Sequence, residues 1–378
     1  MTMVGDGSWG SGIGIPDSLP RVQGHGYRIH CRNIASMTSK PVRNQSFAMI
    51  NCDDISYFKK ILGERGVVLE EEKLDDANTD WMRKFKGSSK LMLQPRSTQE
   101  VSQILDYCNS RRLAVVPQGG NTGLVGGSVP VFDEVLKEAA KLGEMSQLML
   151  GACALFDTVH FMEVFLVLKH LDGLRDPLPS AKHNFYILIE TTGSMESHDK
   201  EKLESFLLQS MENGLLNDGV LAQDVNQASS FWRIREGIPE ALMKAGAVYK
   251  YDLSLPPEKM YNLVEEMRER LGTAANVVAY GHLGDGNLHL NISTRQYNDS
   301  ILSKIEPFVY EWTSEQRGSI SAEHGLGLMK ANKIHYSKSA ETVQLMAAIK
   351  KLLDPNGILN PYKVLPTSIL SQSGVDEP

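Results

Sequence analysis

Residues 280–291 constrain the fold of this chain more than any other stretch, because they describe a β-hairpin with polar groups at fixed positions. An apolar run leads into Asp285-Gly286, and alternating residues follow it. Asp-Gly favours the two-residue type I′ turn, since both central residues of that turn need a positive φ. The turn predicts that His282 and His289 face each other across the ladder, with Cβ atoms about 5 Å apart.

The alternation of this hairpin separates a polar face from an apolar one. Asn291 shares the face of the two histidines, while Leu288, Leu290 and Ile292 take the opposite face, where we expect the core. Imidazole is the commonest metal ligand in proteins, so the polar face is a candidate metal site. Two histidines alone are more often ordinary hairpin residues than metal ligands, and a metal site therefore needs a further ligand.

Residues 321–327 offer that ligand. Glu323 and His324 stand side by side, followed by Gly325, which lets the backbone approach a ligand closely. Two histidines and one glutamate with open coordination positions are typical of a catalytic rather than a structural ion site. We predict that His282, His289 and Glu323 bind a divalent ion, and that His324 is a base beside it.

Composition excludes several classes of protein. The 378 residues carry a net charge of −7, which disfavours nucleic acid or an anionic membrane surface as the main partner. The four cysteines form no C-x-x-C pair, as expected for a reducing compartment. No apolar run is long enough to predict a membrane span.

Residues 1–45 differ from the rest of the chain. They hold five Lys and Arg against two Asp, with many Ser and Gly and without the apolar core of a secretory signal. This composition predicts a mitochondrial transit peptide and a location in the matrix. A disordered tail of the same composition is the alternative.

A glycine-rich run follows a short apolar strand expected at residues 113–116. Residues 117–128 contain five glycines, whose unshielded N–H groups suit a phosphate or pyrophosphate. The spacing is neither that of the Rossmann fingerprint nor that of the Walker motif. The alternative is a surface loop, but a loop this rich in glycine directly after a strand favours a functional role.

The glycine run, the 282–291 hairpin, Glu323-His324 and the tail segment 357–361 together resemble the flavin-linked 2-hydroxy acid dehydrogenases of the vanillyl-alcohol-oxidase type. The resemblance implies an enzyme that oxidises D-2-hydroxyglutarate to 2-oxoglutarate by metal-assisted proton abstraction and hydride transfer to FAD. It implies zinc as the divalent ion and an electron acceptor of the electron-transfer-flavoprotein type, and it leaves a homodimer open. D-lactate is the alternative substrate.

The resemblance also assigns residues. His282, His289 and Glu323 hold the ion, and His324 takes the hydroxyl proton. Substrate contacts fall to Arg235, Lys250, Asn291 and His324; without the family, Arg235 and Lys250 would be read as ordinary ion-pair residues. FAD contacts fall to Pro117, Gly119, Gly120, Asn121, Thr122, Gly123, Gly126, Gly127, Ser128 and Asn360.

The chain departs from the family pattern after Val135. A helical run is expected at residues 136–144, and between residues 151 and 246 glycines occur only singly, so the second part of the flavin domain is missing. The remaining half-domain should retain FAD weakly or not at all. Two further functions stay open: a non-catalytic, truncated form that binds metal and acid, and, last in rank, a hydrolase with metal-bound water.

These observations predict four parts and an α+β fold. Residues 1–45 are the transit or disordered segment, and residues 46–136 are a truncated FAD-binding half-domain of the PCMH type. Residues 137–366 form a ferredoxin-like α+β substrate and metal domain, with helices on one face of its sheet and a C-terminal helical segment. Residues 367–378 are a flexible tail. The clearest helices are expected at residues 225–245, 300–313 and 341–353.

Overall fold

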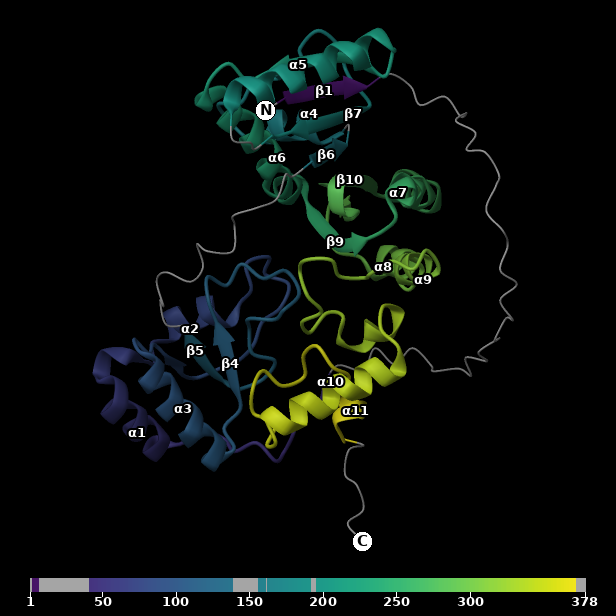
Figure 1. The fold of residues 1–378 in the computed structure, drawn as a ribbon. Coiled ribbons are helices and arrows are strands. Elements are labelled where there is room, and N and C mark those ends of the chain that lie inside the picture. The colour runs from purple at the N-terminus through teal and green to yellow at the C-terminus, as the bar shows by residue number, and fades with distance from the viewer. Residues whose placement is uncertain (1, 7–40, 139–155, 161, 192–194, 372–378) are drawn as a thin grey trace.

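Two β-sheets organise the protein (Figure 1). The computed structural model describes residues 2–6, 41–138, 156–160, 162–191 and 195–371. The larger sheet is antiparallel throughout, in the order β8-β1-β7-β6-β10-β11-β9. Its strands are β1 (Thr2–Asp6), β6 (Phe156–His160), β7 (Phe185–Ile189), β8 (Leu216–Leu221), β9 (Ala247–Ser254), β10 (Asn276–His282) and β11 (Asn287–Thr294).

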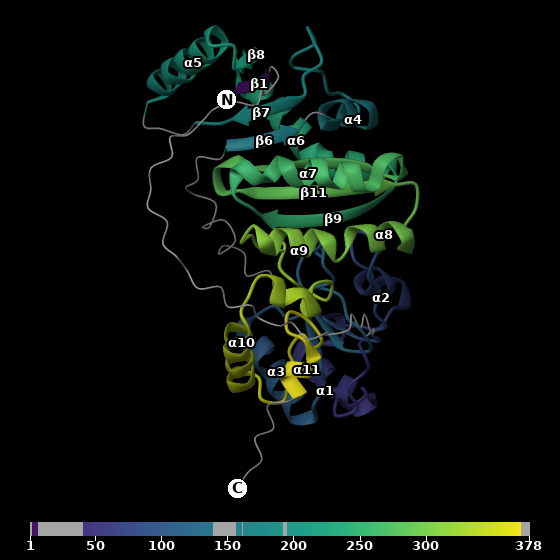
Figure 2. The ribbon, with the colours of Figure 1, turned by 90° about the vertical axis from the view of Figure 1, so that its right-hand side faces the viewer.

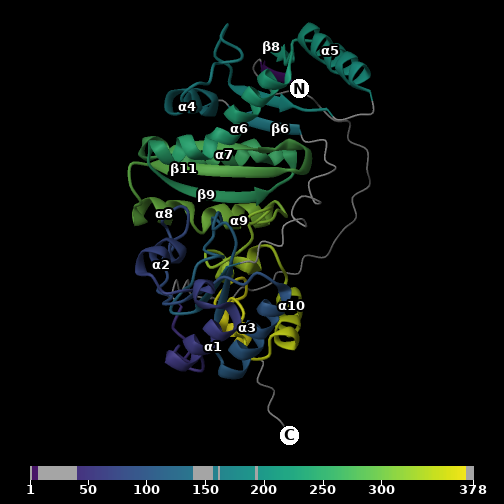
Figure 3. The ribbon, with the colours of Figure 1, turned by 90° about the vertical axis from the view of Figure 1, so that its left-hand side faces the viewer.

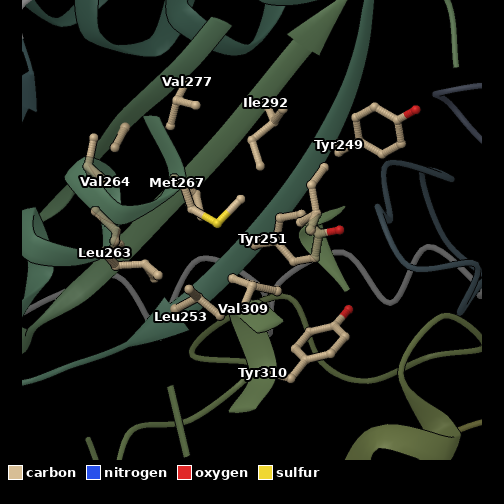
Figure 4. Close-up of a cluster of buried hydrophobic side chains, with 14 of the residues drawn as sticks. Tyr249, Tyr251, Leu253, Leu263, Val264, Met267, Val277, Ile292, Val309 and Tyr310 are labelled. Atoms are coloured by element: carbon tan, nitrogen blue, oxygen red, sulfur yellow. The ribbon is translucent and has the colours of Figure 1, made fainter. Parts of the chain in front are cut away.

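Helices cover both faces of this sheet, and the expectation of helices on one face is wrong. On one face, α7 (Pro257–Leu271), α8 (Asp299–Ile305) and α9 (Phe308–Glu315) bury the apolar side chains of β9, β10 and β11. Leu288, Leu290 and Ile292 lie in this core, as the alternation predicted (Figure 4). On the other face, α4 (Met162–His170) and α6 (Val225–Ala245) pack against β7 and β10 (Figure 2).

Local capping explains where several helices begin. Asp224, Ser339 and Ser97 each accept a backbone N–H from the first turn of α6, α10 (Ala340–Leu353) and α3 (Thr98–Arg111). The single helix expected at residues 300–313 is divided, because Pro307, which lacks an N–H, separates α8 from α9. The remaining helices are α1 (Cys52–Leu62), α2 (Glu71–Asn78), α5 (Glu196–Glu212) and α11 (Thr367–Ser371), with 3₁₀ turns η1 (Glu64–Gly66), η2 (Gly272–Ala274), η3 (Leu283–Asp285) and η4 (Ala331–Tyr336).

The smaller sheet has the order β2-β3-β5-β4. Its strands are β2 (Val67–Val68), β3 (Met92–Leu93), β4 (Val115–Gln118) and β5 (Val135–Glu138). The helix expected from residue 136 is wrong for residues 136–138, which belong to β5; residues 139–144 lie outside the described part. β5 pairs in parallel with both β3 and β4, and burial of Val135 and Leu136 in this central position overrides local helix propensity.

The C-terminal segment joins this smaller sheet. Val115 donates its N–H to the Ile358 carbonyl (2.8 Å), and Asn360 donates its N–H to the Val115 carbonyl (2.8 Å). Ile358 and Tyr362 are buried in the same core as the interior of the sheet. The small lobe, which lies below the large sheet in Figure 3, is therefore built from residues 41–138 together with the C-terminal segment.

Two further expectations concern the ends of the chain. Residues 2–6, within the expected transit segment, form β1 between β7 and β8, while residues 7–40 lie outside the described part. Of the tail expected at residues 367–378, residues 367–371 form α11. Among the described helices, none has both the length and the apolar character that crossing a bilayer requires.

Candidate metal centre and active site

The hairpin that carries the two histidines has a different register from the one its turn predicted. Tyr280 opposes His289 and His282 opposes Asn287, because residues 283–286 form the loop, with Gly286 at φ 71°. The expected direct pairing of His282 with His289 is therefore wrong. The register differs by two residues, which preserves the face of every side chain, and the two imidazoles lie diagonally with ring centroids 5.6 Å apart.

Glu323 brings the predicted metal ligands together. One carboxylate oxygen, Oε1, lies 3.6 Å from His282 Nε2, and the other, Oε2, lies 3.7 Å from His289 Nε2. Two ligand atoms at about 2.1 Å from a tetrahedral ion stand ~3.4 Å apart. Glu323 therefore lies between the two imidazoles, with one carboxylate oxygen near each.

His324 and Asp252 complete the cluster. The His324 ring stacks on that of His289 at 5.3 Å between centroids. Asp252 on β9 stands opposite His289 in the sheet, and one donor atom from each of Asp252, His289, Glu323 and His324 falls within 4.8 Å of the others. Asp252 was not predicted as a site residue, although an acidic residue on an otherwise apolar strand is a signal that could have identified it.

Burial favours the neutral imidazole at His289 and His324. It lowers the pKa of His289 to about 3; Asp252 opposes this shift, and the neighbouring charges of His324, Arg235 and His282 add to it. Burial also lowers the pKa of His324 against the opposing effect of Asp252. Burial raises the pKa of Glu323, whereas the nearby imidazole of His282 lowers it. A neutral imidazole can ligate a metal or accept a proton.

The predicted substrate contacts come from α6, β11 and β9, the elements that also carry or adjoin the cluster. Arg235, buried on α6, has Nη2 3.5 Å from His282 Nε2 and its guanidinium 4.8 Å from the Tyr280 ring centroid. Asn291 is buried on the histidine face and donates its amide N–H to the His289 carbonyl (3.0 Å). Lys250 opposes Asn291 on β9.

Lys250 also reaches the small lobe. Its Nζ lies 5.5 Å from the ring centroid of Trp81, and burial lowers its pKa to about 8. Trp81 follows α2 in the small lobe and was not singled out by the sequence. The two lobes therefore meet at a side chain that the resemblance assigned to substrate.

The glycine-rich run leaves β4 at Pro117 and Gln118 and forms an open loop. A Cβ added at Gly119 or Gly127 would meet no atom within 4 Å, and one at Gly120 only Thr122 at 3.9 Å. This free backbone suits the N–H cradle expected for a phosphate. Asn121 and Ser128 brace the loop: the Ser128 hydroxyl donates to Asn121 Oδ1 (2.8 Å) and Asn121 Nδ2 to the Thr79 carbonyl (2.7 Å).

Three further positions of the loop are set by packing. Gly126 (φ 69°) lies against the Phe85 ring, and Gly123 lies next to Ser128. Asn360 Nδ2 donates to the Gly127 carbonyl (3.3 Å), so the C-terminal tail contacts the loop where the resemblance placed it.

The glycine-rich loop is also tied to the segment that carries Glu323 and His324. The Val125 carbonyl accepts N–H bonds from Leu328 (2.9 Å) and Met329 (3.1 Å). At Gly327 (φ 49°), an added Cβ would stand 2.4 Å from the same carbonyl. The candidate cofactor loop and the candidate metal ligands are thus held side by side through backbone contacts.

Comparison with known families agrees with this geometry. The family model for the C-terminal domain of FAD linked oxidases matches residues 122–364, and the model for an FAD binding domain matches residues 89–145. The first match spans the hairpin, Glu323-His324 and the tail; the second spans the glycine loop.

Curated relatives are similar over most of the chain. The mitochondrial D-2-hydroxyglutarate dehydrogenase of Arabidopsis thaliana is 48% identical over 480 residues, covering 89% of this chain and 86% of the relative. The enzyme of the same name from Bos taurus is 36% identical, with 86% of each chain covered. A putative mitochondrial D-lactate dehydrogenase of Schizosaccharomyces pombe is 34% identical, covering 85% of this chain and 91% of the relative.

The alignment with the Arabidopsis protein is longer than the chain itself, which has 378 residues. The relative therefore has residues inside the aligned span to which nothing in this chain corresponds. The match to the FAD binding domain ends at residue 145, so the difference is expected after the small sheet.

Solved structures support the fold class. p-Cresol methylhydroxylase with substrate bound has a TM-score of 0.56 at 11% identity, covering 84% of this chain and 97% of the other. 4-Ethylphenol oxidase from Gulosibacter chungangensis has a TM-score of 0.56 at 13% identity, covering 84% and 98%. At these identities the likeness concerns the fold alone, and it confirms the α+β architecture of the PCMH type.

Proposed function

The chain belongs to the FAD-linked oxidase family as an FAD-dependent hydroxy acid dehydrogenase, and we propose that it oxidises D-2-hydroxyglutarate to 2-oxoglutarate. One observation carries the proposal: Glu323 places one carboxylate oxygen beside His282 and the other beside His289, with the His324 ring stacked on that of His289. By its relatives' names, we place the protein in the mitochondrion, and by the resemblance in the matrix with an electron-transfer-flavoprotein type of acceptor.

The residues divide the proton chemistry between them. When bound, a divalent ion would supply the Lewis acid that lowers the pKa of the substrate hydroxyl, and FAD would supply the hydride acceptor. His282, His289 and Glu323 hold the ion, for which zinc suits the ligand set. His324 takes the hydroxyl proton, because burial lowers the pKa of its half-buried imidazole and its ring stacks on that of His289. Asn291 contacts the substrate from the same face of the sheet.

Two cations favour a dicarboxylic acid over lactate. Arg235 stands on the His282 side of the cluster and Lys250 stands on β9 beside Trp81, so each can bind one carboxylate. D-Lactate has a single carboxylate and can therefore engage only one of the two cations. D-Lactate remains the second candidate substrate, because one relative is named a putative D-lactate dehydrogenase.

The metal centre is tested by metal analysis of the purified protein. We expect about one equivalent of zinc in the wild type and strong loss of zinc in His289→Ala, because two remaining ligands hold the ion poorly. His335→Ala is a matched control, since His335 lies on η4 and is no part of the cluster. Equal metal content in the wild type and His289→Ala would reject the site.

The substrate is tested by dye reduction with added FAD. D-2-hydroxyglutarate, D-lactate and malate are compared at equal concentration, and we expect D-2-hydroxyglutarate to give the highest kcat/KM. A preference for D-lactate would assign the alternative substrate.

The alignment gap favours one other function. Because relatives contain residues that this chain lacks, we also consider a truncated form that binds metal and acid without turnover, alone or as a homodimer. Zinc binding and D-2-hydroxyglutarate binding without dye reduction, even in excess FAD, would identify this form.

A further inference from the structure

Asp252 is the least exposed charged group of the cluster. It lies on β9 directly opposite His289 of β11, and its residue is 1% exposed. A buried carboxylate needs partners on both oxygens. Oδ2 accepts the backbone N–H groups of Glu323 and His324, each at 2.7 Å, and Oδ1 accepts the Asn287 amide N–H at 2.8 Å.

These bonds explain why the carboxylate stays ionised. Burial on its own raises the pKa of Asp252, but the N–H groups of His324 and Glu323 and the Asn287 amide, together with the His324 ring, bring the pKa below its usual value. Asp252 therefore fixes the backbone from which both the Glu323 ligand and the His324 base project.

The two nitrogens of His289 face different carboxylates. Nε2 lies 3.7 Å from Glu323 Oε2, whereas Nδ1 lies 3.7 Å from Asp252 Oδ1. An ion shared by His282 Nε2, His289 Nε2 and Glu323 lies on the Nε2 side of the ring. Asp252 belongs to the same group of donor atoms as His289, Glu323 and His324, but its Oδ1 faces Nδ1, the ring nitrogen that the proposed ion does not use.

We propose that Asp252 is a positioning residue rather than a metal ligand: it orients the His289 ring from the Nδ1 side and holds the Glu323-His324 backbone. The inference rests on the proposed metal centre and adds a residue to it. Carboxylates that orient a ligating histidine through its second nitrogen raise metal affinity by about 10- to 100-fold. Asp252 combines this role with the support of a second ligand, Glu323, through the main chain.

Asp252→Asn tests the proposal with little change in volume. The new amide group must point its N–H₂ either at the two backbone N–H groups or at the Asn287 amide, and both are donors. We expect the zinc affinity of Asp252→Asn, measured by competition with a chromophoric chelator, to fall about 10- to 100-fold. This readout does not depend on flavin or turnover.

A matched control separates positioning from general stability. Asp54 in the small lobe is also fully buried and accepts bonds from Arg111 and Tyr107, far from the cluster in sequence. Asp54→Asn should lower the thermal unfolding temperature without changing zinc affinity. The visible spectrum of the Co²⁺-loaded protein should change in Asp252→Asn, because His289 and Glu323 are reoriented, and should stay unchanged in Asp54→Asn.

Each outcome bears on one claim. Unchanged zinc affinity and an unchanged Co²⁺ spectrum in Asp252→Asn would overturn the inference and leave the metal centre intact. Loss of zinc as complete as in His289→Ala would make Asp252 a ligand and also overturn it. A wild type that binds no zinc would instead reject the proposed function.

A milder variant covers the case in which Asp252→Asn does not fold. Asn287→Ala removes only the amide bond to Asp252 Oδ1. We expect a several-fold decrease in zinc affinity, since one neutral–charged hydrogen bond of three is lost. Zinc affinity equal to that of the wild type would contradict the proposal.

Discussion

At the scale of single residues, Lys250 is the group whose environment most clearly indicates a ligand-binding role. Its Nζ lies over the Trp81 ring, and no described carboxylate forms an ion pair with it. Burial lowers its pKa to about 8 because the charged form loses solvation. A substrate carboxylate would compensate for the solvation that the Lys250 ammonium group loses on burial, as in the proposed binding of a dicarboxylic acid.

This environment predicts a pH dependence that one substrate shows and another does not. Lys250 is protonated below its pKa of about 8 and neutral above it, so kcat/KM for D-2-hydroxyglutarate should fall as pH rises through about 8. Lys250→Met should raise KM for D-2-hydroxyglutarate by about 10- to 100-fold, the value of a charged hydrogen bond of about 1.5–3 kcal/mol.

D-Lactate and Lys250→Arg provide the controls. D-Lactate lacks the second carboxylate, so its kcat/KM should change little across pH 8 or in Lys250→Met, and Lys250→Arg should flatten the alkaline decline. An equal loss for both substrates would show that Lys250 does not bind the distal carboxylate.

At the scale of elements, the β10–β11 hairpin depends on two close backbone approaches. A Cβ at Gly281 would stand 2.1 Å from the Asn287 carbonyl, directly across the ladder and next to His282. A Cβ at Gly286 would stand 2.3 Å from the Leu255 carbonyl, and the backbone there has φ 71°. The tight spacing of β9, β10 and β11 therefore positions His282 and His289.

Gly281→Ala tests this dependence. We expect a loss of about 1–3 kcal/mol in the free energy of unfolding, because backbone atoms have to move apart. The zinc content should also fall, since His282 moves away from Glu323. Urea denaturation and metal analysis measure the two effects.

Gly119→Ala is the control for stability, because its added Cβ meets no atom within 4 Å. If Gly281→Ala were as stable as Gly119→Ala, the close approach across the ladder would have no role in the hairpin.

At the scale of the whole molecule, the small lobe is assembled from segments far apart in sequence. Lys363, buried in the tail, donates to the carbonyls of Gly127 (3.0 Å) and Val129 (2.6 Å) and to Asn360 Oδ1 (2.7 Å). The tail thus braces the glycine loop, and it also bonds to the metal-ligand segment, where Val364 donates its N–H to the Gly327 carbonyl (2.9 Å). The loop is formed, but the Arabidopsis relative has residues within the aligned span to which nothing in this chain corresponds.

We therefore predict that the purified chain retains FAD below one equivalent. The phosphate loop supplies part of the binding surface, while the residues that relatives have in addition are not there to cover the rest of the cofactor. Visible absorbance after gel filtration measures the retained flavin, with the longer Arabidopsis enzyme purified in parallel as a control. A yellow protein with stoichiometric flavin would contradict the prediction.

Sequence reasoning identified the side chains of the candidate site better than their geometry. Period-two alternation assigned His282 and His289 to one face of the hairpin, and this survived a register that the Asp-Gly turn predicted wrongly. The reason is that a shift of two residues keeps every side chain on its face. Helix α6 was also predicted with its observed ends, since Asp224 is a typical N-cap residue and Gly246 is a typical residue at the end of a helix.

Local patterns in the sequence by themselves determined the faces, the caps and the candidate ligands, because each depends on residues a few positions apart. Only the tertiary structure decided the rest. It made Asp252 a partner of Glu323 and His324, turned Val135–Glu138 into a central strand and added residues 358–360 to the small sheet. These features depend on burial and hydrogen bonds between segments distant in sequence, and no local pattern encodes which distant segment supplies the partner.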